Sequence, residues 1–402
     1  MNRKLPRALA TVAFLAPALS LGAQKVVNLP KPDAEYAEPF TQINSVRELM
    51  DGRVLVADTR DKTVLLIDFR SGNTTKVGRE GSGPGEYALP SRLVALPLDT
   101  SAIYDPLNSR YVLVGPDGKA GKEFRLEQSV TAGRGGGRMG GMMVGGQMPR
   151  GTDARGRIYY EGSGLSFSPD GAPSVADSAG ILRYDRATKT SDTVAWVHLP
   201  PNNTRVSGGR GNMNIMIGAT PFAARDDWAV LQDGGVAVVR VADYHVDWYS
   251  PSGARRAGAP VKFDRIAVSE GDKEEWRNAR KGAVGMTVRV EGAVTTRGAG
   301  PIGGGVNLPD PEWPQFKPPF AQGGVFARPN GEVWVLRSRK AGDKVPKYDV
   351  FAPSGAHLGQ VALPASTRLV GFGRTTIYTV RVDEDDLQFL QRRTLKEGPV
   401  VP

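Results

Sequence analysis

Three segments of this chain repeat one pattern, an aromatic-rich run followed by a Pro-x-Gly turn. They are YVLVGPDGK at 111–119, VDWYSPSGA at 246–254 and YDVFAPSGA at 348–356. Each comes after another alternating run that opens on a turn, as GEVWVLRS does after Pro329-Asn330. Alternating residues between turns are typical of β-strands. Because the same strand pair recurs along the chain, the sequence predicts a repeat architecture rather than an ordinary globular domain.

Counting the strand that follows the first turn of each unit gives units near residues 53, 102, 157, 236, 332 and 376. Since a propeller blade takes about 40–50 residues, we predict an all-β fold over residues 24–402, a six-bladed β-propeller with four-stranded antiparallel blades. The last unit shows only three strands. The segment QKVVNLP at 24–30 is expected to pair with the final blade over 366–395 and close the ring, which removes an exposed sheet edge.

Three stretches depart from the blade pattern and are expected to be loop insertions, at about 131–151, 203–221 and 269–319. The first two are rich in Gly and Met and are expected to be flexible linkers. The alternative is that thioethers such as those of Met139, Met142 and Met143 bind Cu(I). In the third, SEGDKEEWRNARKG at 269–282 predicts a helix with Asp272 and Glu275 as a capping box.

A Gly-rich corner, GREGSGPGEYALP at 78–90, could present backbone N–H groups to a phosphate or could turn the chain between two sheets. A phosphate loop needs a helix N-terminus behind it. The prolines at 90 and 97 would break a helix there, and no Lys-Ser or Lys-Thr pair follows the glycines. We therefore expect Gly81, Gly83 and Gly85 to supply positive φ angles at a turn between strands.

The stretch MDGRVLVADTRDKTVLLIDFRSG and the later VGREGSGPGEYALPSRLVAL together resemble an NHL repeat. They contain a Gly turn, a strand ending in Val-Ala-Asp, a second strand, and a Gly-rich corner before an aromatic residue and a Pro. The resemblance covers residues 46–96 and implies a six-bladed propeller of the extracytoplasmic bacterial type. Proteins of this fold include RNA binders, lyases, esterases and protein-binding scaffolds, so function has to be argued from a site.

The first 23 residues have the pattern of a secretory signal peptide. Three basic residues precede an uncharged stretch from Ala8 to Ala23 that ends in small residues. The chain has no Cys, which argues against a lipid anchor and a disulfide framework. Cleavage would take the formal charge from +10 to +7 by removing Arg3, Lys4 and Arg7. We predict a periplasmic or extracellular protein whose partners are acidic proteins or small anions rather than nucleic acid.

Catalytic constellations are not apparent in the sequence. The only histidines are His198, His245 and His357, none of them on an expected innermost strand. No Ser lies in a G-x-S-x-G elbow. We predict no catalytic residue, metal or cofactor, no transmembrane segment after signal cleavage, and a monomer. The alternative is a metal-dependent lyase or lactonase with its site in the central channel. A lyase would need three His ligands that converge on the channel. For a calcium-dependent lactonase, the candidate ligands are Asp153, Asp226 and Asp227.

One regularity points to a binding site. Aligning the units by their first turn places an arginine near the start of the innermost strand in five of the six blades: Arg47, Arg92, Arg150, Arg225 and Arg368. Since innermost strands line the channel, these side chains are predicted to form a cationic ring that binds a small anion or an acidic partner. The alternative is that each arginine pairs with a blade carboxylate, such as Asp58 or Glu86, and only joins neighbouring blades.

Overall fold

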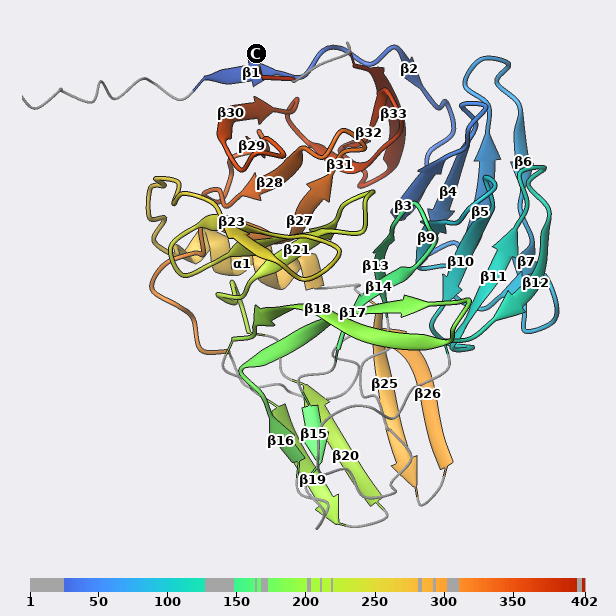
Figure 1. Ribbon diagram of the computed structural model, residues 1–402, viewed down its shortest axis with the longest axis horizontal. Helices are drawn as coiled ribbons and strands as arrows, with labels where there is room; N and C mark the ends of the chain where they lie inside the picture. Colours follow the sequence, from blue (N-terminus) through green and yellow to red (C-terminus); the bar gives the residue numbers. More distant parts are fainter. Residues whose placement is uncertain are drawn as a thin grey trace, which may run out of the picture.

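In a computed structural model, six sheets lie around a central axis, and the chain is a six-bladed β-propeller, as the repeat predicts (Figure 1). The structure describes residues 25–126, 148–162, 165–167, 173–200, 204–209, 212–217, 220–280, 284–291, 294–301, 311–395 and 400–401. The predicted signal peptide and Met139, Met142 and Met143 lie outside these residues. No helix of the described chain is long and apolar enough to cross a membrane.

The first three blades follow one another along the chain. Blade 1 contains β3 (Ile43–Glu48), β4 (Val54–Asp58), β5 (Thr63–Ile67) and β6 (Thr74–Lys76). Blade 2 contains β9 (Arg92–Ala95), β10 (Ser101–Asp105), β11 (Arg110–Val114) and β12 (Ala120–Phe124). Blade 3 contains β13 (Pro149–Thr152), β14 (Ile158–Glu161), β17 (Ser178–Asp185) and β18 (Thr190–His198). The first strand of each blade is innermost.

The other three blades complete the ring. Blade 4 contains β21 (Asp227–Val230), β22 (Val236–Arg240), β23 (His245–Tyr249) and β24 (Arg255–Ala257). Blade 5 contains β27 (Phe320–Ala327), β28 (Val333–Arg337), β29 (Lys347–Phe351) and β30 (His357–Ala362). Blade 6 contains β31 (Thr367–Phe372), β32 (Thr376–Val382) and β33 (Gln388–Thr394). This last blade takes its fourth strand from the N-terminal part of the chain.

The N-terminal segment closes the ring, but not with the residues that the sequence predicts. The strand β1 (Val26–Asn28) runs parallel to β30 and so extends blade 5, not the final blade. The fourth strand of blade 6 is β2 (Ala34–Glu35), which pairs with β33. Leu29, between the two, is buried among residues of blades 5 and 6. The prediction that residues 24–30 join blade 6 is therefore wrong, because β1 pairs with blade 5. A link of five residues then leads from β1 to β2, which pairs with blade 6.

The apolar core is divided among the gaps between adjacent blades. On β4, Val54 and Val56 pack against blade 6, whereas Leu55 and Ala57 pack against blade 2. This follows from the strand geometry, in which successive side chains point to opposite faces of the sheet. Both faces of a blade are covered, so a strand such as β4 is buried throughout. Polar side chains on the innermost strands therefore meet neighbouring blades or the axis.

The insertions contain more regular structure than the sequence predicts. Residues expected to be a flexible linker form β19 (Thr204–Gly209) and β20 (Asn212–Ile217). These strands share a sheet with β25 (Val284–Glu291) and β26 (Val294–Pro301), on the blade 3 side of the ring (Figure 1). A separate hairpin consists of β15 (Leu165–Phe167) and β16 (Pro173–Val175). The insertion predicted at about 131–151 extends too far, because residues 149–151 belong to β13, the innermost strand of blade 3.

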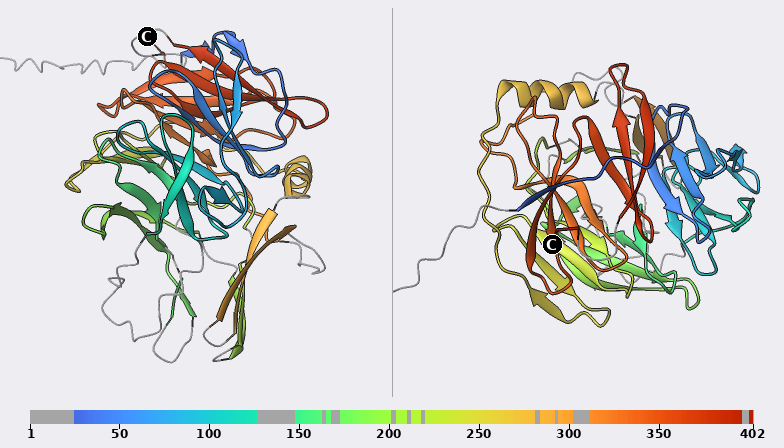
Figure 2. Two further views of the ribbon diagram at one scale, coloured as in Figure 1. Left: turned by 90° about the vertical axis from the view of Figure 1, so that its right-hand side faces the viewer. Right: turned by 90° about the horizontal axis from the view of Figure 1, so that it is seen from above.

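The predicted helix is α1 (Glu270–Arg280), which lies against one face of the ring (Figure 2). Its N-cap is Ser269: the Asp272 N–H donates to Ser269 Oγ at 3.3 Å, and the Ser269 N–H donates to Asp272 Oδ2 at 2.8 Å. This is a reciprocal capping arrangement. The capping box therefore consists of Ser269 and Asp272, one turn earlier than the predicted pair of Asp272 and Glu275.

The Gly-rich corner turns the chain between blades 1 and 2 and contains the short strands β7 (Arg79–Glu80) and β8 (Glu86–Tyr87). The carboxylate of Glu86 occupies this corner. The Gly83 N–H donates to Glu86 Oε2 at 2.7 Å, and Arg79 Nε donates to Glu86 Oε1 at 2.7 Å. These contacts lower the pKa of Glu86, first the Gly83 N–H and then Arg79. Gly81 has a φ of +153°, a conformation that L side chains rarely adopt, so this position favours glycine.

Candidate functional site

The five predicted arginines all lie on or beside innermost strands, but at different depths along the axis. The hairpin after each innermost strand gives a common reference, as where the Leu96 N–H donates to the Thr100 carbonyl. Each arginine precedes the residue that donates this hydrogen bond in its own blade by a different number of positions. The number is two for Arg47, three for Arg150, four for Arg92, five for Arg368 and six for Arg225. At about 3.3 Å per strand residue, this spread is roughly 13 Å. The predicted common position near the strand start does not hold for Arg47, which is the fifth residue of β3.

Four of these arginines bridge adjacent blades. Arg47 Nη1 contacts Asp99 Oδ1 at 2.7 Å, and Arg225 Nη2 contacts Glu161 Oε1 at 2.5 Å. The other two donate as follows: Arg150 Nη2 to Asp227 Oδ1 and the Trp228 carbonyl, and Arg368 Nη2 to the Ile43 carbonyl and Gln388 Oε1. The partners differ from the carboxylates suggested by the sequence. Asp58 instead accepts backbone N–H groups from Thr41 and Gln42.

Arg92 is different, because within the described chain it has no hydrogen bond or ion pair. It is the first residue of β9 and is only partly exposed. It lies on the same face of that strand as Val94, which packs against blade 3. The pKa of Arg92 is lowered to about 10, mainly by burial and then by the nearby charge of Arg150, whereas Asp227 opposes the shift. Arg92 therefore carries a positive charge that its surroundings do not neutralise.

Asp227, beside Arg92 and Arg150, has both carboxylate oxygens in use. Its Oδ1 accepts from Arg150 and from the Trp228 N–H at 2.9 Å, and its Oδ2 accepts from the Gly323 N–H at 2.7 Å. Only 4 % of this side chain is exposed. The Arg150 guanidinium also lies 5.4 Å from the centre of the Trp228 ring. These contacts hold Arg150 in place while leaving its Nε and Nη1 without a hydrogen bond in the described chain.

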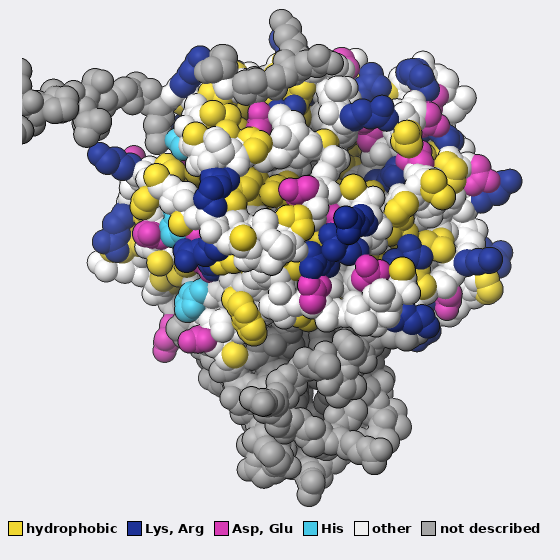
Figure 3. All heavy atoms as spheres, in the orientation of Figure 1, with side chains coloured by type: hydrophobic (Ala, Val, Ile, Leu, Met, Phe, Trp, Pro, Cys, Tyr) yellow, Lys and Arg dark blue, Asp and Glu magenta, His cyan; other side chains and the backbone are white. Residues whose placement is uncertain are grey.

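Small residues on the innermost strands leave space around the axis. A Cβ on Gly323 would meet no atom within 4 Å, and one on Gly151 would touch only the Val230 side chain, at 3.4 Å or more. Ala95, three residues after Arg92, is exposed. In the face seen in Figure 3, basic side chains gather near the middle of the ring with acidic ones beside them. Gly323, whose N–H donates to Asp227, therefore leaves open space beside this carboxylate.

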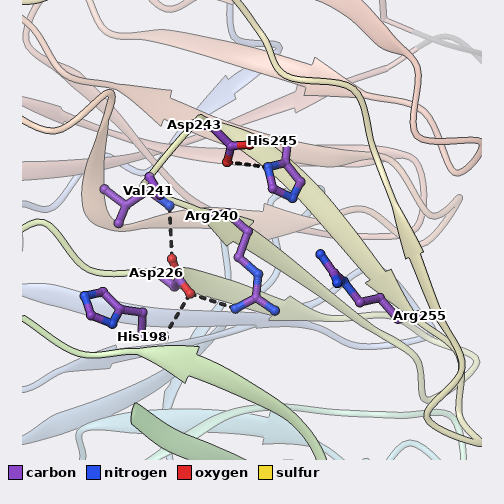
Figure 4. Close-up of a pocket in the computed structure, with 8 residues that line it drawn as sticks. His198, Asp226, Arg240, Val241, Asp243, His245 and Arg255 are labelled. Atoms are coloured by element: carbon purple, nitrogen blue, oxygen red, sulfur yellow. Dashed lines mark hydrogen bonds and ion pairs between the residues drawn. The ribbon is translucent and has the colours of Figure 1, made fainter. Parts of the chain in front are cut away.

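A second polar group lines a pocket of about 320 Å³ between blades 3 and 4 (Figure 4). At its centre, Asp226 accepts from the His198 N–H at 2.9 Å and from the Val241 N–H at 3.0 Å. Arg240 donates to Asp226 at 2.7 Å and to the Trp196 carbonyl at 2.9 Å. These contacts join β18 to β22 across the gap between the blades. The charged groups at the centre of this pocket are therefore used to hold two blades together.

The residues weighed for catalysis do not converge. The three histidines lie away from the axis: His198 ends β18, His245 begins β23 and His357 begins β30. Asp153 accepts from Arg157 Nε at 2.6 Å and from backbone N–H groups of its own hairpin. Within the described residues, no group of three or more His, Asp or Glu is placed to hold a metal ion.

Sequence reasoning missed the two carboxylates that organise the inner arginines. From the sequence, Asp227 is predicted only as a candidate calcium ligand, and Glu161 is not predicted as a site residue. Glu161 accepts from Arg225 and from Trp228 Nε1 at 3.2 Å. The Asp226-Asp227-Trp228 run at the start of β21 was a usable signal, since an acidic pair entering an innermost strand is costly to bury without partners.

No protein-family model and no curated protein matches this sequence. Solved structures match over nearly the whole chain. A streptogramin B lyase is 11 % identical, covering 92 % of this chain and 88 % of its own, with a TM-score of 0.39. The calcium-binding protein regucalcin from Agrobacterium tumefaciens is 10 % identical, covering 94 % and 100 %, with a TM-score of 0.36. A luciferin-regenerating enzyme is 9 % identical, covering 92 % and 96 %, with a TM-score of 0.43. At these values the matches say nothing about what this chain does.

Proposed function

We propose that this chain is an exported, NHL-type propeller that binds an anionic group in its channel and performs no chemistry of its own. The anion belongs to a small ligand or to an acidic side chain of a partner protein. Export rests on the signal-peptide pattern of residues 1–23, and the positive charge of the remaining chain favours acidic partners. Arg92 and Arg150 are the residues that would contact the anion, and Arg47, Arg225 and Arg368 join the blades around them.

The observation that carries this proposal is the unpaired guanidinium of Arg92. Arginine side chains in partly buried positions usually pair with a carboxylate, as Arg47 and Arg225 do here. Arg92 has no such partner in the described chain, and Arg150 beside it adds a second positive charge. Clustered cations attract a counter-charge, and the planar fork of a guanidinium suits an oxyanion. A bound anion would supply the neutralisation that the chain does not.

The test compares wild type with Arg92→Met in acetate, methanesulfonate and sulfate against chloride at equal ionic strength. A ligand that binds only the folded state raises its melting temperature. At least one oxyanion is expected to raise the melting temperature of wild type, and the increase should be lost in Arg92→Met. Arg70→Met is the matched control, because the Arg70 side chain is 69 % exposed on blade 1. Equal responses of wild type and Arg92→Met would contradict the proposal.

A further inference from the structure

The charges around Arg92 leave a small excess of positive charge. Arg150 is neutralised by Asp227, and Arg225 is neutralised by Glu161. Arg92 remains, so the formal charge of this group of five side chains is +1. The ion pair of Arg150 and Asp227 is largely buried, with 25 % and 4 % of the two side chains exposed. Buried pairs are screened by salt much less than surface pairs. The net charge of these five side chains therefore influences which anions can bind beside them.

Asp227 also limits the site through its hydrogen bonding. An ionised carboxylate can only accept hydrogen bonds, and both oxygens of Asp227 already do so. An oxyanion that reaches Arg150 therefore comes near a fixed negative charge with no donor to offer it. One negative charge on the ligand is balanced by Arg92. A second would remain uncompensated next to Asp227, and like charges at close range are strongly unfavourable.

We infer that the channel site accepts an oxyanion with a single negative charge, typically a carboxylate, and that Asp227 excludes dianionic groups such as sulfate and phosphate. This deepens the proposed function and rests on it. Asp227 is the specificity-determining residue, because it holds Arg150 and sets the charge of the site. The ligand class is therefore a carboxylic acid or an acidic side chain rather than a phosphorylated compound.

The experiment uses two probes with the same tetrahedral sulfur–oxygen geometry and different charge, methanesulfonate and sulfate, with acetate as the carboxylate. Affinities are measured by calorimetric titration at constant ionic strength. In wild type we expect acetate and methanesulfonate to bind and sulfate to bind roughly tenfold more weakly or not at all. In Asp227→Asn, which retains a side-chain oxygen as an acceptor, sulfate should gain roughly tenfold relative to methanesulfonate.

A second variant covers the case in which Asp227→Asn does not fold. Glu161→Gln raises the charge of the same group by one while leaving Asp227 and its hydrogen bonds intact, and it should also favour sulfate. Binding of sulfate by wild type as tight as that of methanesulfonate, lost in Arg92→Met, would overturn this inference and leave the proposed function standing. So would an unchanged preference in both variants. Failure of every anion to bind through Arg92 would remove the proposed function itself.

Discussion

Replacing Arg92 by Met should make the ligand-free protein more stable. Met has a similar length and an apolar body, so it can occupy the space beside Val94 without a charge. Arg92 has no hydrogen bond or ion pair in the described chain, so the substitution removes no attractive contact of that kind. What it removes is a desolvated positive charge next to Arg150.

The size of the effect follows from the pKa of Arg92, which burial and the charge of Arg150 lower from its ordinary value to about 10 in the folded protein. One pKa unit corresponds to about 1.4 kcal/mol, so the charged form is disfavoured by at most roughly 3.5 kcal/mol on folding. We expect Arg92→Met to raise the free energy of unfolding by about 1–3 kcal/mol, because it removes the desolvated charge and places an apolar side chain in the same space. A lowered pKa penalises the charged form at every pH below about 10, so the full gain is expected at neutral pH.

The assay is unfolding in urea, which adds no anion, at pH 7.5 in low-affinity buffer anions. The midpoint should rise while the slope stays constant, since the surface exposed on unfolding is unchanged. The matched control is Arg47→Met, in which an arginine with 11 % exposure loses Asp99 as its partner and leaves that carboxylate unpaired. This control should lose about 1–3 kcal/mol. A loss of stability in Arg92→Met would refute the reasoning, because it would mean that the charge is compensated in the folded protein.

Three further predictions concern the framework. Truncation through Glu35 should lower the melting temperature more than truncation through Leu29. The reason is that only the longer deletion removes β2, whose Glu35 contacts Arg381 and Gln391. Equal melting temperatures of the two truncated proteins would argue against closure of the ring by β2. Ser269→Ala should cost about 1 kcal/mol, measured by chemical unfolding, because it removes the N-cap of α1, and no change would mean that the cap is dispensable. Stability should fall as the pH drops below about 4, because the pKa of Asp349 is lowered in the folded protein and its ionised form is lost there. Burial alone would raise this pKa, but the contacts with His357, Arg337 and Tyr244 lower it by more. In Asp349→Asn the melting temperature should be lower than that of wild type at pH 7 and should change less as the pH falls below about 4.

The sequence was sufficient for the architecture because that information is local and repeated. The Pro-x-Gly turns at 251–253 and 353–355 follow β23 and β29, where the aromatic runs predict strands. The six units correspond to the six blades, and the helix at 269–282 is found at Glu270–Arg280. Each of these features depends on side-chain alternation, turn residues or capping within about ten residues. The NHL resemblance, which covers one unit, adds the expected corner but identifies no ligand.

The site depends on contacts between residues far apart in the chain, which the sequence alone does not fix. The five arginines look equivalent when the units are aligned by their turns, yet the structure distributes them over five depths. Arg150 meets Asp227 across 77 positions of sequence, and Arg368 reaches the Ile43 carbonyl across 325. Likewise β1 joins blade 5 instead of blade 6. Sequence determines which face of a strand a side chain occupies, but the axial offset between blades determines its partner. That offset decided which arginine was left without a counter-charge.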